Sequence, residues 1–289
     1  MPTDPASQLA SPAVPGGFFG HPRGLATLFF TELWERFSYY GMRAILILYL
    51  TATVADGGLG MDVARAGAIY GLYTAFVYLT ALPGGWIADR LIGQRRAVLV
   101  GGIVIALGHF SLAIESMATF YLGLILIVIG TGQLKPNVST MVGELYPEGG
   151  ARRDAGFSIF YMGINTGAFI GPLIVGFLGE RIDWHAGFAA AGVGMVLGLV
   201  QYVWGGRLLG EAGLHPDRQH AGGRGGRTLL LGVAGAVGVV VLAGLLHHGG
   251  FFQLTAEGLA NATGVIIAAI ALLYFASLFL SRDLDRAEK

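Results

Sequence analysis

The chain has 289 residues, of which 54% are apolar and only 12% are charged, whereas soluble domains carry about 25% charged residues. Its 48 glycines follow no collagen-like period and are scattered through apolar runs, as in packed membrane helices. This composition argues against an ordinary soluble fold and against disorder, and the zero net charge gives no reason to expect nucleic acid as a partner. The absence of cysteine excludes disulfides and thiolate metal sites.

The hydrophobicity pattern predicts an all-α integral membrane protein. A bilayer core requires about 20 mainly apolar residues in a helix. The sequence offers eight such stretches, over residues 25–54, 66–88, 97–114, 118–143, 154–178, 184–206, 228–247 and 259–280. The lipid bilayer is therefore the first partner that the sequence implies.

Polar segments between these stretches divide the chain. Residues 1–24 are proline-containing and lack the features of a signal peptide. We expect a cytoplasmic N-terminal tail at 1–24, a six-helix bundle at 25–208, a polar, glycine-rich cytoplasmic linker at 209–227, a transmembrane helix hairpin at 228–280 and a cytoplasmic end at 281–289.

The basic residues predict the orientation of the chain. Outside the spans, thirteen Lys and Arg lie before the first span, after even-numbered spans or at the C-terminus, and only Arg65 and Arg181 lie in the opposite loops. This distribution follows the positive-inside rule. It places both termini of the chain in the cytoplasm. We expect the membrane to be the plasma (cell inner) membrane.

The first span carries charges that are expensive in a bilayer. An ionisable side chain within a span costs about 2.5–3.5 kcal/mol on insertion scales and normally faces a cavity or the protein interior. At 100° per residue, one polar helix face of about 140° carries Glu32, Glu35, Arg36, Tyr39, Tyr40 and Arg43. Mutual neutralisation alone does not explain four charges and two tyrosines on one face, so we expect a polar cavity there.

The fourth and fifth spans add polar groups to this cavity. Lys135 precedes Pro136, which frees a backbone carbonyl, and lies too far from the span's end to snorkel to the interface. Asn165 lies among glycines whose four-residue spacing indicates close helix packing. Fixed cations suit a ligand carboxylate, and crowded glutamates suit a proton carrier. The residues themselves thus indicate a carboxylate substrate that moves together with protons.

Four segments resemble the proton-dependent oligopeptide transporter family of the major facilitator superfamily. Residues 32–40 (ELWERFSYY) match the family motif E-x-x-E-R-F-x-Y-Y, and residues 130–137 (GTGQLKPN) and 160–167 (FYMGINTG) are similar to family signatures. Residues 85–96 (GWIADRLIGQRR) resemble a loop signature of the whole superfamily. The resemblance covers about 25–208, and the segment 228–280 resembles a hairpin that bacterial members carry between their two six-helix halves.

The resemblance implies a proton-coupled symporter of di- and tripeptides that works by alternating access, with protons as the coupling ion and without a cofactor. It implies a coupling role for Glu32, Glu35, Arg36 and Lys135. The peptide would be bound by Arg36, Tyr39, Tyr40, Arg43, Tyr78, Lys135 and Asn165. A conformational latch at the cytoplasmic end would be formed by Gly85, Asp89, Arg90, Gly93, Arg95 and Arg96.

Two features depart from the family pattern. Some members carry a titrating histidine in the second helix, whereas residues 66–88 contain none, so coupling would depend on carboxylates. The second six-helix bundle of the family has no counterpart in residues 1–289, and this bundle is an implied partner. We therefore expect that this chain alone does not transport.

Other functions stay open at the level of the sequence. The same scaffold can carry another substrate, such as nitrate or a modified amino acid, or the chain can be a non-transporting membrane subunit or receptor. An intramembrane enzyme built on Glu32 and Glu35 is disfavoured, since the chain has no G-x-S-x-G, H-E-x-x-H or Cys nucleophile. The seven histidines lack metal-ligand spacing, so neither a catalytic residue nor a metal site is expected.

Overall fold

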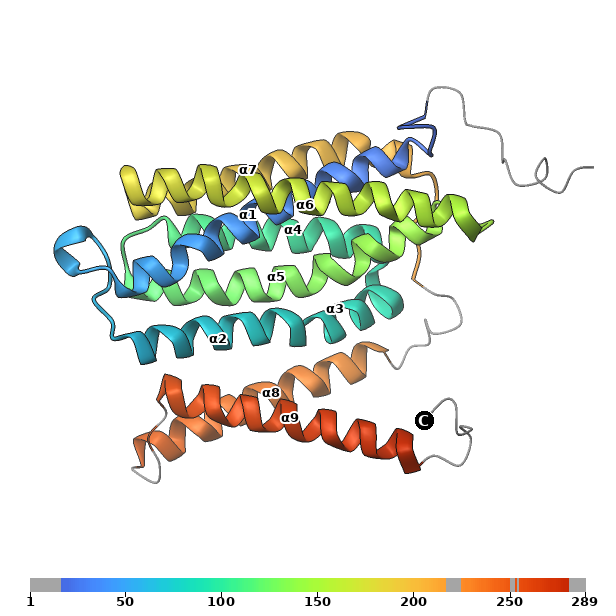
Figure 1. Cartoon of the computed structure of the whole chain (residues 1–289). Helices are drawn as coiled ribbons and strands as arrows, with labels where there is room; N and C mark the ends of the chain where they lie inside the picture. The colour runs from blue at the N-terminus through green and yellow to red at the C-terminus, as the bar shows by residue number, and fades with distance from the viewer. Residues whose placement is uncertain (1–16, 217–224, 250–252, 254, 281–289) are drawn as a thin grey trace, which may run out of the picture.

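A computed structural model describes residues 17–216, 225–249, 253 and 255–280 of the chain. These residues are helical, with a single isolated β-bridge between Phe18 and His21 and no β-sheet within the described ranges. The helices run roughly along one common direction, and the later pair α8 and α9 lies beside the others, next to α2 (Figure 1). The expected all-α fold class is confirmed.

Each predicted crossing corresponds to a helical segment of the structure. The first six crossings are formed by α1 (Gly24–Thr51), α2 with α3 (Val63–Leu79 and Ala81–Ile87), α4 (Gln94–Leu112), α5 (Met117–Glu144), α6 (Gly150–Arg181) and α7 (Trp184–Gly205). The hairpin consists of α8 (Gly225–His248) and α9 (Ala256–Leu280). Short 3-10 turns cover Val54–Asp56 and Gly206–Leu209.

Six of the described helical stretches are long and apolar enough to cross a membrane by length and composition: Val63–Ile92, Gln94–Leu112, Met117–Glu144, Gly150–Arg181, Trp184–Leu209 and Ala256–Ala276. The helix α1 is not among them, because any 18-residue stretch of it contains at least three of its four charged residues. The helix α1 thus carries more charge than a span that faces only lipid. This agrees with a position of its polar face inside the protein.

The second crossing is interrupted, a feature that the hydrophobicity pattern did not predict. Thr80 separates α2 from α3, and its hydroxyl donates to the carbonyl of Val128 on α5 at 3.0 Å. Pro83 lies within α3 and has no amide hydrogen to donate. A π-helical turn over Ala88–Ile92 then ends the crossing. Such turns are often found at functional sites, and this one carries part of the predicted latch.

Glycines bring the helices into close contact. A Cβ built on Gly167 of α6 would lie 2.1 Å from the carbonyl oxygen of Leu33, and one built on Gly171 would lie 2.4 Å from that of Phe37. A Cβ built on Gly163 would lie 2.9 Å from the carbonyl oxygen of Phe29. The four-residue glycine spacing in α6 predicted close helix packing, and the structure shows that the partner is α1.

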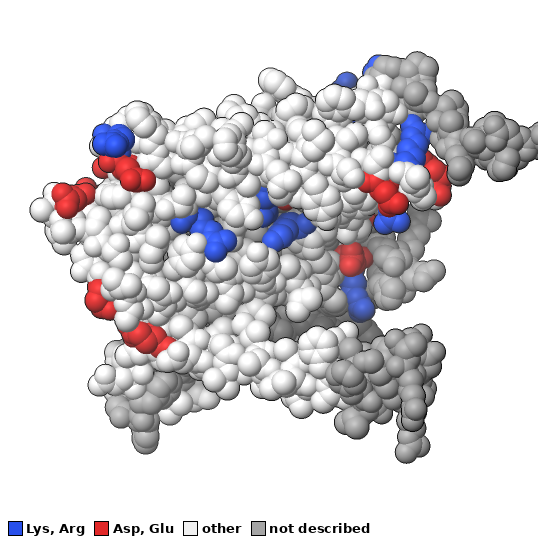
Figure 2. Space-filling model, in the orientation of Figure 1, with Lys and Arg blue, Asp and Glu red and all other residues white. Residues whose placement is uncertain are grey.

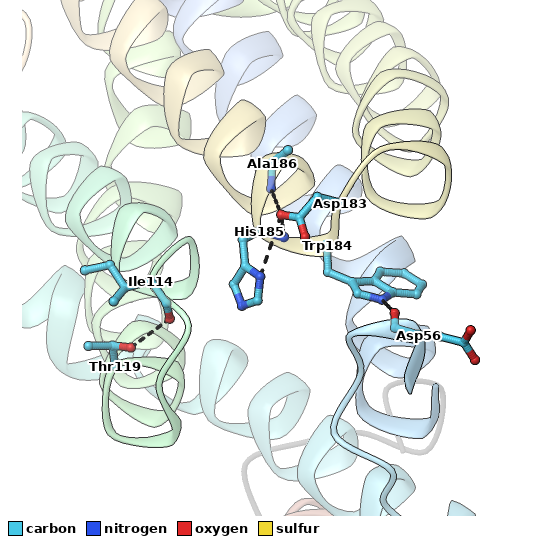
Figure 3. A network of polar contacts seen from close by, with 7 residues as sticks. All are labelled: Asp56, Ile114, Thr119, Asp183, Trp184, His185 and Ala186. Atoms are coloured by element: carbon cyan, nitrogen blue, oxygen red, sulfur yellow. Dashed lines mark hydrogen bonds and ion pairs between the residues drawn. The ribbon is translucent and has the colours of Figure 1, made fainter. Parts of the chain in front are cut away.

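The ends of α1 and α7 are joined by the polar contacts that Figure 3 shows. The Asp183 carboxylate caps α7, because its Oδ1 accepts hydrogen bonds from the backbone amides of His185 and Ala186 at 2.9 and 3.0 Å. The Trp184 indole donates to the backbone carbonyl of Asp56 at 2.9 Å. These contacts fix the turn after α1 against the start of α7.

Candidate functional site

The polar face of α1 is built around Arg36, which lies between two glutamates. Its Nε is 3.0 Å from Glu32 Oε1, and its Nη2 contacts Glu35 Oε2. All three side chains are buried. The second oxygens, Glu32 Oε2 and Glu35 Oε1, have no hydrogen-bond partner among the described residues. With both glutamates ionised, this triad has a net charge of −1, so it can accept a proton without losing its internal ion pair.

Helix packing holds the triad in place. Gly167 of α6 lies directly against Arg36, since a Cβ on that glycine would come within 3.0 Å of the arginine Cβ. On the opposite side of α1, Trp34 and Phe37 pack against Gly198 and Gly194 of α7. The apolar side of α1 therefore packs against α7. The charged residues share a different face of α1, as the helical period predicted.

Tyrosines surround the cations of α1. The Arg36 guanidinium lies 5.2 Å from the ring centre of Tyr39 and 6.0 Å from that of Tyr40. Arg43 donates through its Nε to the hydroxyl of Tyr70 on α2 and lies 5.1 Å from that ring. Aromatic faces attract cations, so these rings orient both arginines.

Lys135 of α5 faces the same region. Its ammonium lies 4.2 Å from the ring centre of Tyr78 on α2. It interacts electrostatically with Glu32 across the space between α5 and α1, without a direct ion pair within the described residues. The structure therefore brings the lysine of α5 and the charged face of α1 together, as the sequence predicted.

The candidate residues form two layers. Glu32, Glu35, Arg36 and Tyr39 are buried, whereas Tyr40, Arg43 and Lys135 are half-buried, and Tyr78 and Asn165 are exposed. Figure 2 shows basic side chains at mid-length of one long face, away from the other charged groups at the two ends. Among the cations of the candidate site, Arg43 and Lys135 are partly exposed, whereas Arg36 is buried between two carboxylates.

The predicted latch residues lie at the end of the bundle where α3 ends and α4 begins. Asp89 accepts a hydrogen bond from Gln94 Nε2 at 3.0 Å, and Arg90 lies 5.6 Å from the ring centre of Trp86. Gly93 has a φ of 81° and links the π-helical turn to α4. Gly85 is half-buried beside Pro136, and Arg96 is exposed.

Arg95 makes a contact that the sequence did not reveal. Its Nε donates to the carbonyl of Ala212 at 2.7 Å, and its Nη2 donates to that of Gly210. Glu144 of α5 accepts from the backbone amide of Gly213 at 2.7 Å. The segment after α7 is therefore tied to the α3–α4 turn. A polar cleft of about 740 Å³ opens beside it, between Trp86, Asp89, Arg90, Gln94, Glu144 and His215.

The sequence also missed the partners that α2 supplies. Tyr70 was interpreted as a packing or interface residue, yet its hydroxyl accepts from Arg43. Tyr73 is buried and stacks on Tyr39 with ring centres 6.3 Å apart. The spacing of three residues between the two tyrosines, which places them on one helix face, was the available signal. Within the described residues, no group of three His, Asp or Glu side chains is arranged to hold a metal ion.

This arrangement matches known proteins. The sequence profile of the POT family matches residues 95–218. The uncharacterized transporter YclF of Bacillus subtilis is 47% identical over 279 residues, which covers 94% of this chain and 55% of YclF. A di-/tripeptide transporter of Lactococcus lactis subsp. lactis is 44% identical over 277 residues, again covering 94% of this chain and 55% of the relative.

Solved structures show the same fold. A crystal structure of a peptide transporter POT in complex with sulfate superposes with a TM-score of 0.86 at 45% identity, over 98% of this chain and 58% of that chain. The chain thus spans a little over half the length of the proteins that it matches. These relatives are named as transporters, in agreement with the expectation that the chain is not an enzyme.

Proposed function

We propose that the chain, a multi-pass membrane protein, belongs to the POT family and forms part of a proton-coupled symporter of di- and tripeptides. The observation that carries this proposal is the buried Glu32–Arg36–Glu35 triad behind two accessible cations, Arg43 and Lys135. The names of the relatives support a peptide as the substrate class. In this proposal, transport requires the second six-helix bundle, which closes over the open face.

The triad is the proposed proton site. With both glutamates ionised its charge is −1, and it attracts Lys135 through Glu32. Binding one proton brings the triad to zero charge, which weakens its attraction for the lysine and leaves the ammonium available for an anion. The proton and the substrate are thereby linked through one side chain, without a metal or an organic cofactor.

The accessible cations are the proposed site for the C-terminal carboxylate of the peptide. Charge-assisted hydrogen bonds from Lys135 and Arg43 suit a carboxylate, and Tyr70 and Tyr78 keep the two cations in position. Tyr40 and Asn165 would line the same space and contact the peptide backbone. The amino end of the peptide is left for the second bundle.

We further propose that the protein resides in the plasma (cell inner) membrane with the α3–α4 turn in the cytoplasm. The basic residues of the turn, Arg90, Arg95 and Arg96, support this orientation by the positive-inside rule. Asp89, Arg90 and the neighbouring cleft would contact the second bundle when the cytoplasmic side is closed. Rocking of two halves about a midplane site is the general mode of such carriers.

The proposal is tested by uptake in liposomes that contain the complete carrier. Labelled dialanine should accumulate only when a pH gradient, acidic outside, is imposed, and excess unlabelled dipeptide should compete. Nitrate and 5-aminolevulinic acid are tested as alternative substrates. A POT family transporter has been crystallised with 5-aminolevulinic acid. Uptake of either compound without competition by dipeptides would contradict a peptide carrier. Dialanine uptake that is independent of the pH gradient would contradict proton coupling.

A further inference from the structure

A long apolar groove lies on the side of the bundle, between α2, α5 and the first turn of α9. Figure 1 shows α9 lying next to α2, and the two helices are in contact. The groove has a volume of about 890 Å³. Its walls are apolar along most of their length, and they include Ile69, Leu72 and Phe76 of α2 with Leu124, Ile125 and Val128 of α5. It is separate from the polar cleft beside the α3–α4 turn.

The length of the groove matches one leaflet of a bilayer. Along α2 it extends from Arg65 to Phe76, and eleven residues at 1.5 Å each correspond to about 16 Å. A hydrocarbon core is about 30 Å thick, so one leaflet is about 15 Å deep. Both walls belong to stretches that are long and apolar enough to cross a membrane. With α2 crossing the bilayer, a groove of this length would run from the bilayer surface to about its middle, where acyl chains could enter it.

Two opposite charges mark the outer end of the groove. Arg65 of α2 is exposed, and Glu257 in the first turn of α9 is half-buried. Neither side chain makes an ion pair or a hydrogen bond with the residues that the structure describes. A guanidinium is a good partner for a phosphate, and a carboxylate accepts hydrogen bonds from a primary ammonium. The pair therefore suits a headgroup that carries both groups.

We propose that this groove binds a phospholipid of the bilayer whose headgroup carries a phosphate and a primary ammonium. Arg65 binds the phosphate, Glu257 binds the ammonium, and an acyl chain fills the apolar walls down to Phe76. The inner wall includes Tyr73, whose ring stacks on Tyr39 next to Arg36. The rings of Tyr73 and Tyr39 would thus separate a bound lipid from the triad of Glu32, Arg36 and Glu35.

Lipid retention by the purified chain tests this site, independently of transport. Detergent-solubilised protein is incubated with phosphatidylethanolamine, phosphatidylcholine or phosphatidylglycerol and analysed by native mass spectrometry. We expect one phosphatidylethanolamine per chain, retained at least fivefold better than the other two lipids. Arg65→Ala and Glu257→Gln should each reduce that retention by about fivefold or more. Leu72→Trp, which fills the groove, should reduce retention while both charges stay in place.

Matched controls come from the same end of the bundle. Arg181→Ala and Glu180→Gln remove one positive and one negative charge from the end of α6, outside the groove, and should leave retention unchanged. Equal retention by wild type, Arg65→Ala and Leu72→Trp would overturn the site. Preference for phosphatidylglycerol with no effect of Glu257→Gln would overturn the assignment of the headgroup.

Discussion

The charges of α1 are accommodated because each has a partner on the same helix or on α2. Arg36 contacts Glu32 and Glu35, and Arg43 contacts Tyr70. Removing one partner of a buried ion pair leaves an uncompensated charge and costs about 3–5 kcal/mol. A test of function at these positions therefore requires substitutions that change the charge and preserve the shape and the acceptor oxygen, such as glutamine for glutamate.

Glu35→Gln in the complete carrier should abolish proton-driven accumulation of peptide and leave peptide exchange measurable. Glutamine keeps an acceptor for Arg36 but cannot bind the coupling proton. A membrane potential of 100 mV supplies about 2.3 kcal/mol per charge, which corresponds to roughly fiftyfold accumulation of peptide per proton. The Glu35→Gln carrier should not reach this accumulation. Uptake and counterflow in liposomes measure the two activities. Loss of both, with Glu180→Gln unaffected, would indicate a structural role for Glu35.

Lys135→Ala should weaken the binding of free dipeptides more than that of C-amidated dipeptides. A hydrogen bond to a charged group contributes about 1.5–3 kcal/mol, so we expect a loss of about 10- to 100-fold for the free peptide only. Competition against labelled dialanine gives both affinities, and Arg181→Ala is the control for loss of a distant cation. An equal loss for both peptides would exclude a role for Lys135 at the carboxylate.

At the scale of elements, close glycine contacts decide how α3 lies against α5. A Cβ on Gly84 would come within 1.9 Å of the carbonyl oxygen of Gly132. That oxygen is the one that Pro136 deprives of its helical hydrogen bond. The proline therefore frees a carbonyl at the place where the neighbouring helix comes closest.

Gly84→Ala should lower the stability of the folded chain by about 3 kcal/mol, because the backbone of α5 must move to admit one methyl group. Gly71→Ala on α2 adds the same methyl group where no atom lies within 4 Å, and it should have no destabilising effect. Thermal unfolding in detergent, followed by circular dichroism, compares the two variants. Equal unfolding midpoints would show that α3 is not closely packed on α5.

A second element-scale feature connects the segment before α1 to the loop after α5 and to the first turn of α6. The His21 Nδ1 lies 2.9 Å from the Tyr146 hydroxyl, and Arg152 donates to the carbonyl of Gly20 at 3.3 Å. Burial raises the pKa of Tyr146 to about 12, so this phenol is neutral and can donate to the imidazole. Burial and, to a smaller extent, the positive charge of Arg152 lower the pKa of His21 below its usual 6.5.

Acidification should therefore loosen residues 18–21. Above pH 6.5 the imidazole of His21 is neutral in both the attached and the detached segment, and the attachment is fully present. Below pH 6.5 the detached segment takes up a proton more readily, so attachment weakens. Because the chain has no cysteine, a spin label on Phe19→Cys reports the mobility of this segment alone, and mobility should increase between pH 8 and pH 5.

His21→Gln should remove this pH dependence, since glutamine can still accept from Tyr146 but does not titrate. His185→Gln, at the opposite end of the bundle, should keep the pH dependence unchanged. Label mobility that rises equally in the wild-type chain and in His21→Gln would contradict the role of this histidine.

At the scale of the whole molecule, the candidate site has one open side. Tyr78 is 55% exposed and Asn165 is exposed as well, although both lie in apolar, membrane-spanning stretches. In the proposed mechanism, alternating access requires a second half that closes over this face. We expect the chain of residues 1–289, reconstituted alone in liposomes, to show no accumulation of labelled dialanine, with its helical content intact by circular dichroism. Uptake above that of empty liposomes would contradict this expectation.

Local pattern accounts for the part of the site that lies on one helix. Glu32, Glu35, Arg36 and Tyr39 are within two helical turns, so the 3.6-residue period alone places them on one face. The contacts between helices, such as Tyr70 with Arg43 and Arg95 with the carbonyl of Ala212, join residues far apart in the chain. Sequence periodicity contains no information on which neighbouring helix faces which.

The amino-acid sequence by itself determined that the chain is a helical, multi-pass membrane protein and which face of α1 is polar, because apolar length and helical period are local properties. The tertiary structure alone decided that Arg43 contacts Tyr70 of α2 and that the Lys135 ammonium of α5 lies over the ring of Tyr78. It also decided that the second crossing breaks at Thr80 and that an apolar groove separates α5 from α9. These features depend on how closely glycine-containing backbones approach one another, and only the packed helices define that distance.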